Sequence, residues 1–148
     1  MRKVFALAVA CLMLLVLLAG CGGGNGDNGG DEPVIEIGDR LFIMQVDNIY
    51  TNPQRYLGRT VRLQGIFETH HWEGQTNHVV FRNAPGCCGD DGMVGFLLNL
   101  DGAASPADNA WVEVTGELER FGMMPNEIRL RVLDIEEMAE RGMEFVNQ

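Results

Sequence analysis

The chain has one serine, Ser105, and one lysine, Lys3, among its 148 residues. Ser105 precedes Pro106 in a polar stretch and has no histidine at the spacing of a nucleophile motif, so serine-based hydrolysis has no visible machinery. The sequence also contains no His-Glu-x-x-His motif and no phosphate-binding glycine loop between a strand and a helix. We therefore predict that the protein is not an enzyme, with thiol redox chemistry as the remaining catalytic alternative.

Positive charge is scarce as well, because 11 Lys and Arg residues are outnumbered by 21 Asp and Glu residues and the net charge is −10. Loss of an N-terminal signal that includes Arg2 and Lys3 would leave nine arginines against 21 carboxylates, a net charge of −12. Phosphate backbones and anionic headgroups repel such a domain. Nucleic acid is therefore not an expected partner.

The N-terminus carries the most specific motif. The basic pair Arg2-Lys3 precedes an apolar run over residues 4–18, which is shorter than the roughly 20 residues that span a bilayer. Leu18-Ala19-Gly20-Cys21 follows and resembles the lipobox of bacterial lipoproteins. The resemblance implies that a signal peptide over residues 1–20 is removed and that Cys21 carries acyl chains, palmitate among them. An uncleaved anchor and ordinary secretion are the alternatives.

This interpretation places the protein on the extracytoplasmic side of the cell membrane or the outer membrane, held in the lipid bilayer through acylated Cys21. Residues 21–33 are rich in Gly, Asn and Asp and offer nothing to bury after Cys21, so we expect a flexible tether. Residues 34–148 provide chain for one modest core. We predict a single domain there.

Alternating apolar and polar residues dominate that domain and predict strands. Gly65 interrupts the first of them, as expected where a strand bends. We predict a mainly β fold, a small five-stranded antiparallel OB-like barrel, with one helix before it near residues 41–50 and a short C-terminal helix over 136–145 that turns Met138 inward. The predicted strands cover residues 60–67, 78–82, 94–100, 111–118 and 128–135.

Three segments together suggest a family. They are Asn52-Pro-Gln-Arg-Tyr-Leu-Gly58 with the strand up to Gly65, Cys87-Cys88-Gly-Asp-Asp91, and Trp111-Val-Glu-Val-Thr-Gly116. Together they resemble the OB-fold domain of the YcgQ-like family of uncharacterised bacterial proteins, over roughly residues 42–135. In that family the domain is usually the C-terminal half of an integral membrane protein, often encoded beside a predicted permease. The resemblance implies an OB-fold and a membrane permease or another envelope protein as partner.

Cys87 and Cys88 are the only thiols left once the signal is lost and Cys21 is acylated. A bridge between sequence neighbours is strained, because unstrained disulfides join Cα atoms farther apart than 3.8 Å. Three interpretations remain open. The pair is a metal site for Zn²⁺ or Cu(I) with Asp91 or Asp90 as oxygen ligand, a redox pair, or apolar filler.

Further ligands are candidates at two places. Met123 and Met124 lie in a loop that we expect at the cysteine end of the barrel, where two thioethers would suit Cu(I). His78 is the histidine closest in sequence to the cysteines, but we expect it at the other end of its strand, with His70 and His71. The functional hypothesis is a membrane-anchored module that binds a metal ion or small ligand at Cys87 and Cys88. The alternatives are a ligand-free envelope interaction protein that uses the barrel face and a thiol redox protein.

Overall fold

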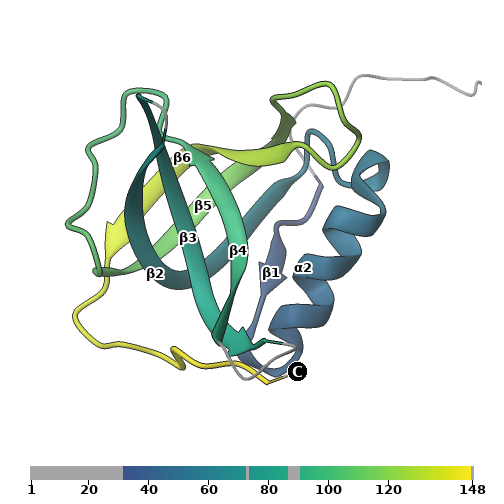
Figure 1. Cartoon of the computed structure of the whole chain (residues 1–148). Coiled ribbons are helices and arrows are strands. Elements are labelled where there is room, and N and C mark those ends of the chain that lie inside the picture. Colours follow the sequence, from purple (N-terminus) through teal and green to yellow (C-terminus); the bar gives the residue numbers. More distant parts are fainter. Residues whose placement is uncertain (1–31, 73, 87–90, 148) are drawn as a thin grey trace, which may run out of the picture. The chain divides into compact units, whose positions relative to one another are not determined.

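The computed structural model describes residues 32–72, 74–86 and 91–147. The chain divides into two units, Met1–Asp31 and Glu32–Gln148, of which the second contains every described element. A short strand and the helices come first, and five long strands follow (Figure 1). The elements are β1 (Ile35–Ile37), η1 (Asp39–Leu41), α2 (Phe42–Thr51), η2 (Pro53–Arg55), β2 (Thr60–Trp72), β3 (Gln75–Pro85), β4 (Asp91–Asn99), β5 (Trp111–Arg120) and β6 (Ile128–Glu137).

Five of the six strands form a closed ring of pairings, in the order β2-β3-β4-β6-β5 and back to β2. Each of the five predicted strands is confirmed, and each is longer or shifted at its ends. The pairings β2–β3, β3–β4, β2–β5 and β5–β6 are antiparallel. This mainly β ring is consistent with the predicted OB-like fold.

The prediction of an antiparallel barrel was wrong at one pair of the ring. β4 and β6 run parallel, with Leu98 opposite Leu130 and Asn99 opposite Arg131. β1, outside the ring, also pairs in parallel with β2. A parallel neighbour requires a long connection, and here β5 lies between β4 and β6 in the chain, so sequence-adjacent strands alone did not reveal the pair.

β2 changes partners in its middle. Residues from Thr60 to Ile66 pair with β5, and residues from Ile66 to Trp72 pair with β3. Gly65 lies at this change, where a Cβ atom would come 2.7 Å from the carbonyl oxygen of Phe81. Gly65, where the sequence predicted a bend, therefore lies where β2 changes its partner from β5 to β3 (Figure 1).

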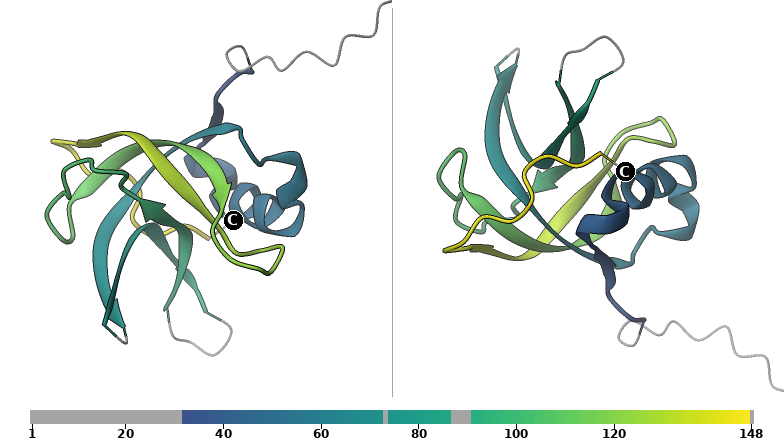
Figure 2. Two further views of the ribbon diagram at one scale, coloured as in Figure 1. Left: turned by 90° about the horizontal axis from the view of Figure 1, so that it is seen from above. Right: turned by 90° about the horizontal axis from the view of Figure 1, so that it is seen from below.

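The core fills the ring and is closed on one side by α2. The buried side chains of Val61, Leu63 and Phe67 alternate along β2 as the period of two predicts. From the helix, Phe42, Val46 and Ile49 complete the same cluster, and Figure 2 shows α2 beside the ring. The helix stops at Thr51, before Asn52-Pro53, as predicted.

The predicted C-terminal helix is absent from the described residues. β6 continues to Glu137 because its last residues still pair with β5, and the chain beyond it is extended and irregular. Met138, expected inside, is exposed. The segment instead returns to β3, where the amide of Asn83 donates to the carbonyl of Glu144 at 2.9 Å and Val146 is buried. No helix among the described residues has the length and apolar character to cross a membrane.

Candidate functional site

The connection between β3 and β4 holds the predicted thiols. The two strands pair in register up to Pro85 opposite Asp91, so the five residues 86–90 close the hairpin. Cys87, Cys88 and Asp90 lie in this connection, outside the described residues. Asp91 begins β4, and its backbone is opposite Pro85. The structure thus describes the base on which the predicted metal site stands.

A buried cation lies on β3 just before that connection. Arg82 is 2% exposed and is the buried charged residue of the described chain. Its Nη1 lies 2.6 Å from Oδ1 of Asp39, and its Nε donates to the carbonyl oxygen of Gln64 at 2.8 Å. A buried guanidinium requires such partners, because an uncompensated charge in the interior is strongly unfavourable.

Two aromatic rings complete the surroundings of Arg82. The guanidinium carbon lies 4.5 Å from the ring centroid of Phe42 and 5.1 Å from that of Trp111. Cations are attracted to the faces of such rings, more strongly where water is excluded. Arg82 therefore joins β3 to the start of α2, to η1 and to the first residue of β5, and it fixes the end of the hairpin from which the cysteines emerge.

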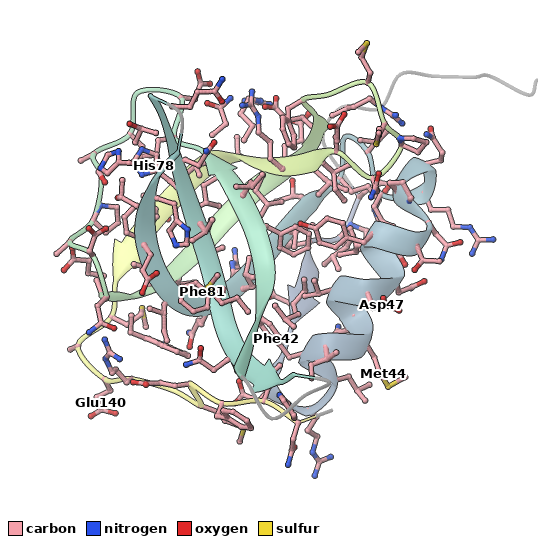
Figure 3. All side chains as sticks on the ribbon, viewed as in Figure 1. Phe42, Met44, Asp47, His78, Phe81 and Glu140 are labelled. Carbon is pink, nitrogen blue, oxygen red and sulfur yellow. The ribbon has the colours of Figure 1, made fainter. Side chains whose placement is uncertain are left out.

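The histidines lie at the opposite end of β3. His70 and His71 belong to β2 itself and are paired with Asn77 and Thr76, while His78 lies opposite Thr69. Seven residues separate His78 from Pro85, about 23 Å along an extended strand. The expectation that the histidines lie at the other end of the strand is thus confirmed. Figure 3 shows His78 far from Phe42, which lies near the thiol end.

Each histidine has a local partner instead. Nε2 of His70 lies 3.0 Å from a carboxylate oxygen of Glu68, Nδ1 of His78 lies 3.3 Å from Oγ1 of Thr69, and the ring of His78 stacks on Phe67 with centroids 5.6 Å apart. Within the described ranges, no group of three or more His, Cys, Asp or Glu side chains is arranged to hold a metal ion. His78 thus lies near the opposite end of β3 from Pro85, whose partner is Asp91.

The methionine loop is also at the far end, contrary to expectation. Met123 and Met124 precede β6, whose early residue Leu130 lies opposite Leu98 near the end of β4. β4 begins at Asp91, about 23 Å from Leu98 along the strand. The prediction that this loop meets the cysteines was wrong because β6 is offset along β4, so that Leu130, the third residue of β6, lies opposite Leu98, the eighth residue of β4 (Figure 1).

The partly buried Tyr50 offers no acid–base chemistry near neutral pH. Burial raises the pKa of Tyr50 to about 12. Its hydroxyl donates to the carbonyl oxygen of Gly95 at 3.2 Å, and its ring stacks on Phe96. It borders a shallow depression of about 160 Å³ beside β3 and β4 that includes Met93 and Leu97. The phenol therefore remains protonated and acts as a link between α2 and β4.

Comparison with known proteins adds the family. The sequence matches the DUF1980 C-terminal domain over residues 26–146. The chain belongs to this family. No curated protein matches the sequence. Among solved structures, the N-terminal domain of PriB protein from Thermoanaerobacter tencongensis is 18% identical, with 55% of this chain and 97% of that chain covered at a TM-score of 0.30.

Arg82 is the residue of this DUF1980 C-terminal domain that sequence reasoning missed. The signal is present in the alternation of β3, where Val80 is fully buried and Arg82, two residues later, falls on the same side of the strand. An arginine at an inward position of a strand indicates a buried ion pair. Its carboxylate partner, Asp39, lies 43 positions away in the chain and follows no sequence spacing rule.

Proposed function

We propose that this protein is a lipid-anchored binding module of the bacterial cell envelope that holds a metal ion through Cys87 and Cys88. The anchor is the acylated Cys21, the thiolates are the soft ligands, and Asp91 or Asp90 supplies an oxygen ligand. Zn²⁺ and Cu(I) are the ions that suit this donor set. The ion would pass to a membrane permease, the partner that the resemblance to the YcgQ-like family implies.

The observation that carries this proposal is the pairing of Pro85 with Asp91. It means that two thiols and two carboxylates emerge from one connection of five residues and its first paired position. Beneath it, Arg82 with Asp39, Phe42 and Trp111 fixes the base of the hairpin. Metal sites are more selective when a rigid scaffold supports the ligands, because less ordering is needed when the ion binds.

Metal content per chain tests the binding site. The protein is purified under reducing conditions and exposed to zinc or, without oxygen, to Cu(I). We expect close to one ion per chain in the wild type and none in the Cys87→Ser/Cys88→Ser variant, because serine is a poor ligand for either ion. His78→Ala and the Met123→Ala/Met124→Ala double variant are matched controls. Both should retain the ion, since these residues lie at the far end of β3 and β4.

Two outcomes would contradict the metal site. Absence of metal from the wild type would leave the thiols to redox chemistry or packing, and retention in the double cysteine variant would place the ion elsewhere.

Anchoring is tested separately by the mass of the mature chain. We expect an N-terminal Cys21 with added acyl chains and, in Cys21→Ser, an unprocessed and unacylated chain. An unmodified Cys21 in the wild type would refute the anchor without bearing on the metal.

A further inference from the structure

The loop between β5 and β6 presents apolar side chains to solvent at its tip. Met123 is 99% exposed and Met124 is 63% exposed, and Phe121, at the start of the loop, is 45% exposed. Side chains of this size are usually covered in part, and a contiguous apolar group on the surface marks an interaction site. The C-terminal segment also exposes large apolar side chains, but none of them is as exposed as Met123 or Met124.

The loop is ordered by its own hydrogen bonds. The amide of Phe121 donates to the carbonyl of Glu127 at 3.1 Å, and the amide of Glu127 donates to the carbonyl of Met124 at 3.1 Å. The Glu127 carboxylate accepts from the amide of Met124 at 2.7 Å. These bonds satisfy backbone groups within the loop, which is what a segment needs if it is to enter a medium that offers no hydrogen bonds.

Two guanidinium groups flank the apolar tip. Nη1 of Arg120 donates to the carbonyl of Met124 at 3.3 Å, and the guanidinium carbon of Arg129 lies 5.6 Å from the ring centroid of Phe121. An apolar tip with arginines around its base fits the boundary of a bilayer, where acyl chains lie below phosphate groups. Arg129 is also paired with Glu119 at 2.7 Å, so Arg120 is the arginine that would meet a phosphate group.

The described chain begins at the end of the domain that carries the loop between β5 and β6. Glu32 forms an ion pair with Arg59 at 2.7 Å, and the carbonyl of Arg59 accepts from the amide of Leu118 at 3.0 Å. β5 ends two residues after Leu118, at Arg120, where the loop starts. Figure 1 shows the loop and the start of the described chain at the upper end of the domain.

The length of chain before Glu32 limits how the domain can lie. Ten residues separate Cys21 from Glu32, and a flexible coil of that length spans roughly 20 Å. A domain of this size is about 35 Å across. An anchor at Cys21 therefore keeps the end of the domain that carries Glu32 and the loop closer to the bilayer than the far end, which carries Met44 (Figure 3).

We infer that residues 121–124 form a membrane-contact loop that inserts Met123 and Met124 into the surface of the bilayer that holds the lipid anchor. The inference rests on the proposed anchoring at Cys21. The occupant is lipid because the tether delivers this loop to a lipid surface and Arg120, at the base of the loop, could meet a phosphate group. Contact through the loop would fix the orientation of the domain on the bilayer.

Tryptophan quenching by brominated lipid tests the inference with a matched pair of variants. Met124→Trp and Met44→Trp place a new indole at positions of equal exposure, 63% and 62%, on opposite ends of the domain. The acylated mature chain is reconstituted into phosphatidylcholine vesicles with brominated acyl chains, because anionic headgroups would repel the acidic domain. We expect the emission of the added tryptophan to fall by about half in Met124→Trp and to stay unchanged in Met44→Trp, since only the interfacial region is within reach of bromine.

Equal quenching in both variants, or no quenching in Met124→Trp on vesicle-bound protein, would overturn the membrane-contact loop and leave Met123 and Met124 to a protein partner. A second arm separates this result from failure of the anchor. The chain from Gly22 with an N-terminal six-histidine tag is bound to vesicles that contain nickel-chelating lipid, which supplies a tether of the same length without acylation. Quenching of Met124→Trp there supports the loop even if the mass of the native chain shows no acyl group on Cys21.

Discussion

Nη1 of Arg82 lies 2.6 Å from Oδ1 of Asp39, and the two side chains differ sharply in exposure, 2% for Arg82 and 57% for Asp39. The carboxylate thus bridges the solvent and a cation that has almost no access to it. The guanidinium also lies over the rings of Phe42 and Trp111. This pair joins η1 to β3 at the base of the hairpin that carries the cysteines.

We predict that Asp39→Asn lowers the free energy of unfolding by about 2 kcal/mol, because it leaves Arg82 buried without its counter-charge, the loss being reduced by the partial exposure of Asp39. The double variant Arg82→Met/Asp39→Asn should recover most of that loss, since the unpaired charge is gone and an apolar chain remains between the rings. Urea unfolding measures both. Glu36→Gln, which breaks the exposed pair with Arg62, is the control and should cost under about 0.5 kcal/mol. A double variant less stable than Asp39→Asn would contradict this account.

Gly95 of β4 lies opposite Phe81 of β3 and has no room for a side chain. A Cβ atom there would come 1.9 Å from the carbonyl oxygen of Val80 and 2.6 Å from Cα of Phe81. Both are backbone atoms and cannot rotate away, so we predict that Gly95→Ala lowers the free energy of unfolding by about 3 kcal/mol. Gly38→Ala is the matched control, because its Cβ would meet nothing within 4 Å and its φ of −95° suits alanine. Thermal unfolding compares the two variants. Equal midpoints would contradict the prediction, because they would mean that β3 and β4 can move apart to admit a methyl group at Gly95.

Stability should fall in strong alkali because of Tyr50. Burial raises its pKa from 10.0 to about 12, so the folded chain keeps a proton that the unfolded chain loses between those values. The contribution is complete below pH about 10 and decreases by up to about 1.4 kcal/mol per pH unit as pH rises toward 12. Urea unfolding at several alkaline pH values should show a shallower decline in Tyr50→Phe than in the wild type. Tyr56→Phe serves as the control, and identical slopes in wild type and Tyr50→Phe would refute the assignment.

The C-terminal segment should protect one amide of β3. The amide of Asn83 donates to the carbonyl of Glu144, and the carbonyl of Asn83 accepts from the amide of Val146 at 2.8 Å. Truncation after Gly142 removes both bonds and the buried Val146 side chain, so we predict a loss of about 2 kcal/mol. Hydrogen exchange gives the local measurement. The Asn83 amide should exchange quickly in the truncated chain while amides of the β5–β6 ladder stay protected, and continued protection of Asn83 would contradict the assignment.

The alternation of apolar and polar residues predicted the strands of the ring, and proline predicted where the helix ends. The period of two along residues 60–67 found β2, and Asn52-Pro53 found the end of α2, because both signals are local. The prediction of a C-terminal helix was wrong because it used a local preference where a long-range pairing decides the structure. Glu136 and Glu137 have good helix propensity, but pairing with Glu113 and Val112 keeps them in β6. Tertiary pairing overrides a weak local preference.

The environment of the candidate site needed long-range information that the sequence does not display. The offset that places Leu98 opposite Leu130 separates Met123 and Met124 from the start of β4, and no local pattern encodes it. The ion pair of Arg82 with Asp39 likewise joins residues 43 positions apart. The proposal of the cysteines as ligands rests on composition and spacing alone, because a thiol pair in a glycine-rich stretch can be recognised without the fold.

The change of partners in the middle of β2 also determines how the chain folds. The β2–β3 hairpin can form as soon as Gln75 and its neighbours exist, but Thr60 must wait for Glu117, 57 positions later, before the ring closes. Contacts of such sequence separation make folding slow, in the range of milliseconds to seconds for domains of this class. The second half of β2 can therefore be paired while its first half still presents an open strand edge, until β5 pairs with it.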